Sequence, residues 1–186
     1  MEWRSFTSTF TATCFLMIAA PSVAHDPADE GCGATSPDVA LEMAVMRSPA
    51  IPVTAVSGKE SPLPELALDK HYAISLIPQS ELSFRAKPGR AARDDLPRGG
   101  ILRFAVPAAA RYRISITSRH WIDVLDGRSA VASAAHHGPG CELLHKIVEF
   151  DLPAGRPLTL QLSGRDDAIV GLAITLSPSA PQKDPA

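Results

Sequence analysis

The densest group of polar side chains that could do chemistry lies between His136 and Lys146 of the 186-residue sequence. It holds His136, His137, Cys141 and His145 around a Gly-Pro-Gly turn. Imidazole is a common metal ligand, so this loop could bind copper or zinc. The spacing matches neither the His-x-His nor the His-Glu-x-x-His pattern of known metal sites. A surface loop without a cofactor is therefore the simpler interpretation, with a Cu or Zn site as the alternative.

His25 is a second candidate for metal binding, because Ala24 ends an apparent leader sequence. If the chain is cut after Ala24, the free amine and the imidazole of His25 could chelate copper, the most strongly bound of the divalent first-row ions. The simpler interpretation is that His25 only begins a loose arm.

Trp121 is the candidate platform for a ligand, since carbohydrate sites stack sugar rings on exposed aromatic side chains. A buried tryptophan also anchors many β-sandwiches, and the sequence favours a core position for Trp121. The chain lacks the Gly-x-Ser-x-Gly motif of serine hydrolases. No nucleophile–base signature stands out, so we expect a protein that is not an enzyme and name no catalytic residue.

Residues 1–24 read as a cleaved signal peptide. A short apolar run precedes Ser22 and Ala24, the small residues that a signal peptidase requires. We therefore expect a periplasmic or secreted protein. The mature chain would keep Cys32 and Cys141, which we expect to form a disulfide in an oxidising compartment. Two free thiols with a redox or metal role are the alternative.

The composition restricts the class of partner. The formal net charge is −2, and acidic and basic residues are scattered along the chain. This pattern argues against nucleic acid as a partner. After the signal, no segment approaches the roughly 18 consecutive apolar residues of a membrane span. The remaining 162 residues (186 − 24) suit one domain.

The hydrophobic pattern predicts a single all-β sandwich. Residues 25–69 are expected to form an N-terminal arm and a proline-rich segment without regular structure, in which Val39–Met46 could be a strand or a helix. Residues 70–176 carry the β-sandwich core, and residues 86–100 form a mobile charged loop. Residues 177–186 form a disordered tail. Two-residue alternation predicts strands at 72–76, 101–106, 111–117 and 158–162. Strands are also expected at 121–125 and 147–152, each of which ends at a turn signal, and at 169–176, which is more continuously apolar.

Two segments carry a resemblance to known families. Phe104–Ile114 reads as a strand, a Pro/Ala turn and a strand entered through Tyr112, and Phe150–Leu160 has a similar form. Both resemble hairpins of jelly-roll carbohydrate-binding modules and pre-peptidase C-terminal domains. The stretch from residue 70 to 176 also resembles small secreted proteins of proteobacteria.

The resemblance implies a jelly-roll-like accessory domain. We accordingly expect a noncatalytic periplasmic binding or accessory module whose partner is an unknown small ligand, a glycan or an envelope protein. One alternative is a metal-binding protein that uses the His136/His137 loop. Another is a structural envelope protein held by contacts through its strand edges.

Overall fold

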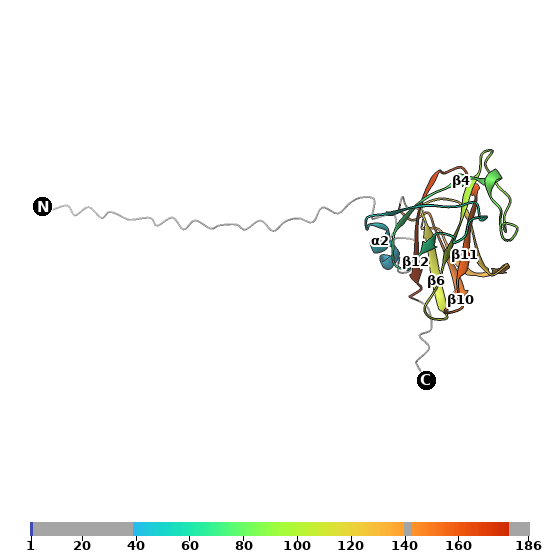
Figure 1. The fold of residues 1–186 in the computed structure, drawn as a ribbon. Helices are drawn as coiled ribbons and strands as arrows, with labels where there is room; N and C mark the ends of the chain where they lie inside the picture. The colour runs from blue at the N-terminus through green and yellow to red at the C-terminus, as the bar shows by residue number, and fades with distance from the viewer. Residues whose placement is uncertain (2–38, 140–142, 179–186) are drawn as a thin grey trace, which may run out of the picture.

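The computed structural model describes residues 1, 39–139 and 143–178, which form a mostly-β sandwich with one short helix (Figure 1). Sheet A contains, in spatial order, β1 (Ile51–Thr54), β3 (Tyr72–Ser75), β12 (Ile169–Leu176), β6 (Ala110–Ile116), β10 (Lys146–Leu152) and β9 (Ser133–His137). Sheet B contains β2 (Glu65–Leu66), β5 (Arg98–Phe104), β11 (Leu158–Arg165), β7 (Trp121–Asp126) and β8 (Ser129–Val131), with β4 (Ile77–Pro78) also paired to β5. The predicted sandwich class is confirmed.

The core between the sheets follows the alternation of the strands. Tyr112, Ile114 and Ile116 face inward from β6, and Leu160 and Leu162 face them from β11. All five are almost fully buried. Apolar burial of this kind contributes roughly 25 cal/mol per Å², which makes the inner faces the main source of stability.

The sequence left open whether Val39–Met46 forms a strand or a helix. This segment contains the helix α2 (Ala40–Met46). Met43 and Met46 pack on the outer face of sheet A. Glu42 is also buried there, where its Oε1 accepts hydrogen bonds from Arg113 Nη1 at 3.2 Å and Thr175 Oγ1 at 3.0 Å. The outer face of β6 is therefore buried beneath the helix rather than open to solvent.

The proline-rich segment differs from the expectation, because it contains β1 and β2. Strand β1 pairs in parallel with β3 and places Pro52 opposite Ala73. β1 is the last strand of sheet A, and an edge strand tolerates proline because one side of its backbone needs no partner. The proline count alone therefore underestimated the regular structure of this segment.

The charged loop is shorter than predicted, since β5 begins at Arg98 rather than after residue 100. The 3-10 turn η2 (Gln79–Glu81) precedes it. The loop is also attached to sheet B. Gln161 Nε2 donates a hydrogen bond to the Ala86 carbonyl at 3.2 Å, and the Arg93 N–H donates to the Gly164 carbonyl at 3.1 Å.

The sequence pair Asp126-Gly127 is typical of a tight hairpin, and a hairpin is present there between β7 and β8. Asp126 pairs with Ser129, so the loop residues are Gly127 and Arg128. Gly127 has a φ of 62°. This left-handed conformation suits glycine and explains its place at the first loop position.

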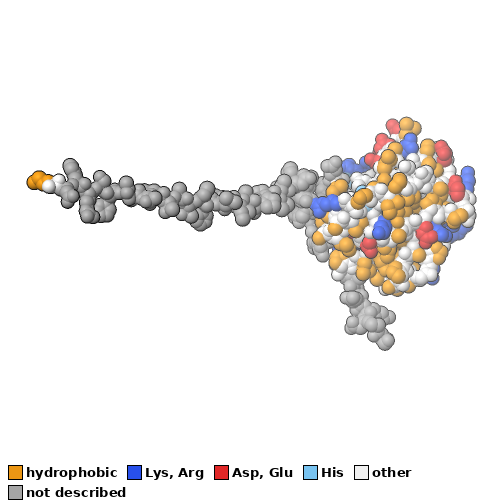
Figure 2. All heavy atoms as spheres, turned by 60° about the vertical axis from the view of Figure 1, so that its left-hand side comes forward, with side chains coloured by type: hydrophobic (Ala, Val, Ile, Leu, Met, Phe, Trp, Pro, Cys, Tyr) orange, Lys and Arg blue, Asp and Glu red, His pale blue; other side chains and the backbone are white. Residues whose placement is uncertain are grey.

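Charges of both signs are scattered among apolar side chains on the face drawn in Figure 2. Among the described residues, no helix has the length and apolar character to span a bilayer. The signal segment beyond Met1, His25, Cys32, Cys141 and most of the predicted tail lie outside the described residues.

Candidate anion-binding pocket

A pocket of about 550 Å³ lies along one side of the sandwich, where the two sheet edges meet. Strands β8 and β9 are separated only by Ala132, so the chain crosses there from sheet B to sheet A. Strand β8 pairs only with residues 124–126 of β7. Within the described residues, the first part of β7 therefore has no paired strand on the β8 side. The pocket lies beside this unpaired part of β7.

The pocket gathers positive charge from four separate parts of the chain. Its cationic side chains come from the 86–97 loop, the β6–β7 connection, β10 and β11, and they are Arg90, Arg93, Arg119, Lys146 and Arg165. Asp123 is the one carboxylate among the lining residues. A chain with a net charge of −2 thus places five of its 18 Lys and Arg residues around one cavity.

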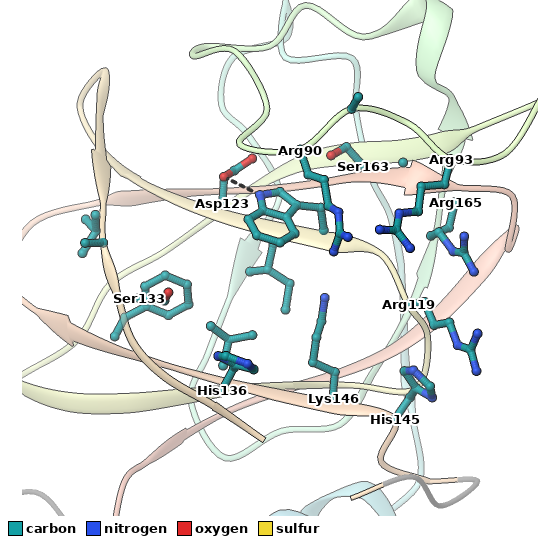
Figure 3. Close-up of a pocket in the computed structure, with 18 residues that line it drawn as sticks. Arg90, Arg93, Arg119, Asp123, Ser133, His136, His145, Lys146, Ser163 and Arg165 are labelled. Carbon is teal, nitrogen blue, oxygen red and sulfur yellow. Dashed lines mark hydrogen bonds between the residues drawn. The ribbon is translucent and has the colours of Figure 1, made fainter. Parts of the chain in front are cut away.

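Most of these cations lack a counter-ion. Arg165 Nη1 lies 3.0 Å from Asp94 Oδ1, but Arg90, Arg93 and Arg119 have no salt-bridge partner within the described residues. In Figure 3, Arg93, Arg119 and Arg165 lie on one side of the pocket and Ser133 and His136 on the other. Arg90 and Lys146 lie between these two groups. Clustered cations with low-dielectric walls concentrate a positive potential that favours anions.

Lys146 and Trp121 form the middle of the pocket. Lys146 Nζ lies 5.8 Å and Arg90 Cζ 5.7 Å from the centroid of the Trp121 ring, within the range of cation–π contacts. Lys146 also donates a hydrogen bond to the backbone carbonyl of His120. Burial, followed by the nearby charge of Arg90, lowers the pKa of Lys146 to about 8, while Asp123 acts in the opposite direction. The ammonium group is therefore poorly compensated before any anion binds.

Asp123 is already engaged in positioning its neighbours. Its Oδ1 accepts a hydrogen bond from Trp121 Nε1 at 2.8 Å, drawn as a dashed line in Figure 3. Its Oδ2 accepts one from the Gly89 backbone N–H at 3.2 Å. A Cβ added to Gly89 would lie 2.8 Å from Trp121 Nε1, so only glycine lets the loop approach this closely. These contacts hold Arg90 at the mouth of the pocket.

Ser163 and His145 complete the polar part of the lining. The Ser163 hydroxyl is buried and has no hydrogen-bond partner among the described residues. Buried polar atoms without a partner are uncommon, and Ser163 lies in the lining of the pocket. Burial, and then the charges of Arg119, Lys146 and Arg165, lower the pKa of His145.

The structure separates the two histidines that the sequence grouped. His136 is opposite Val148 in the β9–β10 ladder and lines the pocket, whereas His137 lies on the outer face, 3.2 Å from Glu149 Oε1. His145 shares the pocket with His136. No group of three or more His, Cys, Asp or Glu residues suited to a metal occurs within residues 39–139 and 143–178. Copper or zinc binding stays a prediction.

Trp121 lies at the pocket wall and is half-buried, so the core position that the sequence favoured is not the one observed. Its role as a ligand platform stays a prediction. His25 and the cysteine pair Cys32 and Cys141 lie outside the described residues and stay predictions.

The five cations were missed as a group at the sequence level because they come from four separate segments of the chain. The one signal was the arginine content of residues 86–100, which was interpreted as a charged loop.

No protein-family model, curated protein or solved structure matches this chain.

Proposed function

We propose that this protein is a noncatalytic binding module for a small anionic ligand. The observation that carries the proposal is the convergence of Arg90, Arg93, Arg119, Lys146 and Arg165 on one cavity with a single carboxylate. A volume of about 550 Å³ is in the range of small-molecule sites. Arginine suits this role because its guanidinium donates hydrogen bonds in a planar fork that matches an oxyanion.

Binding rather than catalysis is favoured by the state of the charged groups. The carboxylate of Asp123 already accepts hydrogen bonds from Trp121 and Gly89 and is not placed as a free base. The remaining charged groups of the lining share one sign, which supports recognition of a complementary charge.

The proposal includes export to the periplasm, a jelly-roll-like relationship of the sandwich and a Cys32–Cys141 disulfide. The signal-like residues 1–24 and the two remaining cysteines support the first and third of these. Mass analysis of the exported protein tests both. A chain that begins at His25 and is two hydrogens lighter than its reduced form is expected, whereas a full-length chain with free thiols would contradict this part.

The binding proposal is tested by calorimetric titration with sodium sulfate at constant ionic strength. Arg119→Ala is the informative variant, since Arg119 is exposed and has no salt-bridge partner among the described residues. Loss of one charge-assisted hydrogen bond should weaken sulfate binding about tenfold or more. Arg128→Ala is the matched control, because Arg128 is exposed in the β7–β8 turn and does not line the pocket.

Saturable sulfate binding that is weakened by Arg119→Ala and retained by Arg128→Ala supports the proposal. No binding to wild type, or equal weakening by both variants, refutes it. The latter result would show that sulfate responds only to the overall charge of the protein.

A further inference from the structure

The pocket has two chemically different ends. The cationic side chains lie at one end, and apolar side chains from both sheets form the other. These apolar side chains are Ile122, Val131, Val148 and Phe150. Ile122, Val148 and Phe150 belong to the hydrophobic core between the sheets, so the apolar end of the pocket reaches the core itself.

The arrangement follows from the course of the chain. Because β8 crosses to β9 through Ala132, the two sheets are joined beside Val131, and the buried side chains of Val148 and Phe150 line the inner end of the pocket. Ser133 and His136 border this end, away from the arginines, as Figure 3 shows. A small inorganic anion held by the arginines would leave the apolar end without a contact.

We propose that the pocket binds an amphiphilic anion, an oxyanion head group attached to an alkyl or acyl chain. The head group binds among Arg93, Arg119 and Arg165, and the chain lies against Val148 and Phe150. This inference rests on the proposed function and adds the class of ligand. Charge complementarity fixes the orientation, because the arginines lie at the other end and an unpaired charge is costly against apolar side chains.

The buried hydroxyl of Ser163 supports the placement of the head group. It lines the pocket, has no partner among the described residues, and precedes Gly164 and Arg165 on β11. On this inference, a small movement of the lining lets an oxyanion held by Arg165 accept the hydrogen bond of this hydroxyl. Trp121, between the two ends, offers a flat apolar side to the first part of the chain.

The test is a calorimetric series with methyl, butyl and hexyl sulfate, all of which carry the same head group. Burial of each methylene should tighten binding about two- to fourfold. Hexyl sulfate should therefore bind at least tenfold more tightly than methyl sulfate. Its heat-capacity change should also be more negative, as burial of apolar surface requires.

Ser133→Trp separates the two ends of the pocket. Ser133 is exposed and borders the apolar end, so a large ring there should fill it. We expect the variant to bind methyl sulfate like wild type and to lose the gain from chain length. Ser129→Trp is the matched control, because Ser129 is exposed on β8 and does not line the pocket. The control should bind the three alkyl sulfates with the same dependence of affinity on chain length as the wild type.

The outcomes distinguish this inference from the proposed function. Equal affinity for all three alkyl sulfates, with Arg119→Ala weakening each, would overturn the amphiphile inference and leave anion binding intact. Hexanol binding as tight as that of hexyl sulfate, and unaffected by Arg119→Ala, would overturn both. A chain-length gain that survives Ser133→Trp would place the chain elsewhere and also overturn the inference.

Discussion

Lys146→Met should change how the stability of the protein depends on alkaline pH. In the folded protein the pKa of Lys146 is lowered to about 8 from its ordinary value of 10.5, chiefly by burial. Between these two pH values the unfolded chain binds more protons at Lys146 than the folded chain does. The free energy of unfolding of the wild type should therefore rise with pH in this window, relative to a protein without the group.

The magnitude follows from the same pair of values. The difference between the two pKa values of Lys146 corresponds to about 3.4 kcal/mol in the free energy of unfolding, at about 1.36 kcal/mol for each pH unit. Because Lys146 is only half-buried, solvent screening reduces this, and we expect about 1.5 kcal/mol. For a protein of this size that corresponds to a difference in Tm of roughly 3–6 °C.

Urea unfolding of wild type and Lys146→Met at about pH 7.5 and pH 10.5 measures the effect. The free energy of unfolding of the wild type, relative to that of Lys146→Met, should be about 1.5 kcal/mol greater at pH 10.5 than at pH 7.5. A loss of stability that does not depend on pH, such as the loss of the hydrogen bond to the His120 carbonyl, cancels in this comparison. Lys59→Met, which removes an exposed lysine, should behave like the wild type. Parallel pH dependence of wild type and Lys146→Met would refute the reasoning.

Three further predictions concern the pocket and the opposite face of sheet A. Sulfate affinity should fall as pH rises through about 8, where Lys146 loses its proton; calorimetry between about pH 7 and pH 9 would contradict the account if affinity stayed constant. Gly89→Ala should push the loop from Trp121 at a cost of about 1 kcal/mol and weaken sulfate binding roughly fivefold, and an unchanged dissociation constant would show that the loop position is unimportant. Glu42→Ala should lower the free energy of unfolding by about 3 kcal/mol in urea, because it breaks a buried ion pair with Arg113, yet leave sulfate affinity unchanged. A loss below 1 kcal/mol would contradict this reading of the ion pair.

The strands were predictable because their signal is local. Two-residue alternation at Tyr112, Ile114 and Ile116 requires only that one face of a strand be buried. The start of β5 was missed because Gly99 and Gly100 resemble a loop. Both glycines are in fact forced by packing, since a Cβ on Gly99 would lie 2.2 Å from the Leu162 carbonyl oxygen and one on Gly100 2.1 Å from Ala55 Cβ.

The pocket was not predictable, because its charges meet only through the fold. Arg90 and Arg165 are far apart in the chain, and the contact of the loop with β11 brings them to one cavity. The adjacent residues His136 and His137 show the opposite case, because they are neighbours in the sequence but are separated by the fold. Strand geometry turns consecutive side chains to opposite faces, so neighbours in sequence face different environments.

The most direct test of anion binding in this pocket is a site-resolved titration. Isotope-labelled protein is titrated with sodium sulfate at constant ionic strength while its amide and indole N–H signals are followed by NMR. The account predicts saturable shifts of the Trp121 indole and the Gly89 amide with one dissociation constant, and no shift of Gly155, which lies in a turn outside the pocket. Small, unsaturable shifts spread over the whole protein would contradict it.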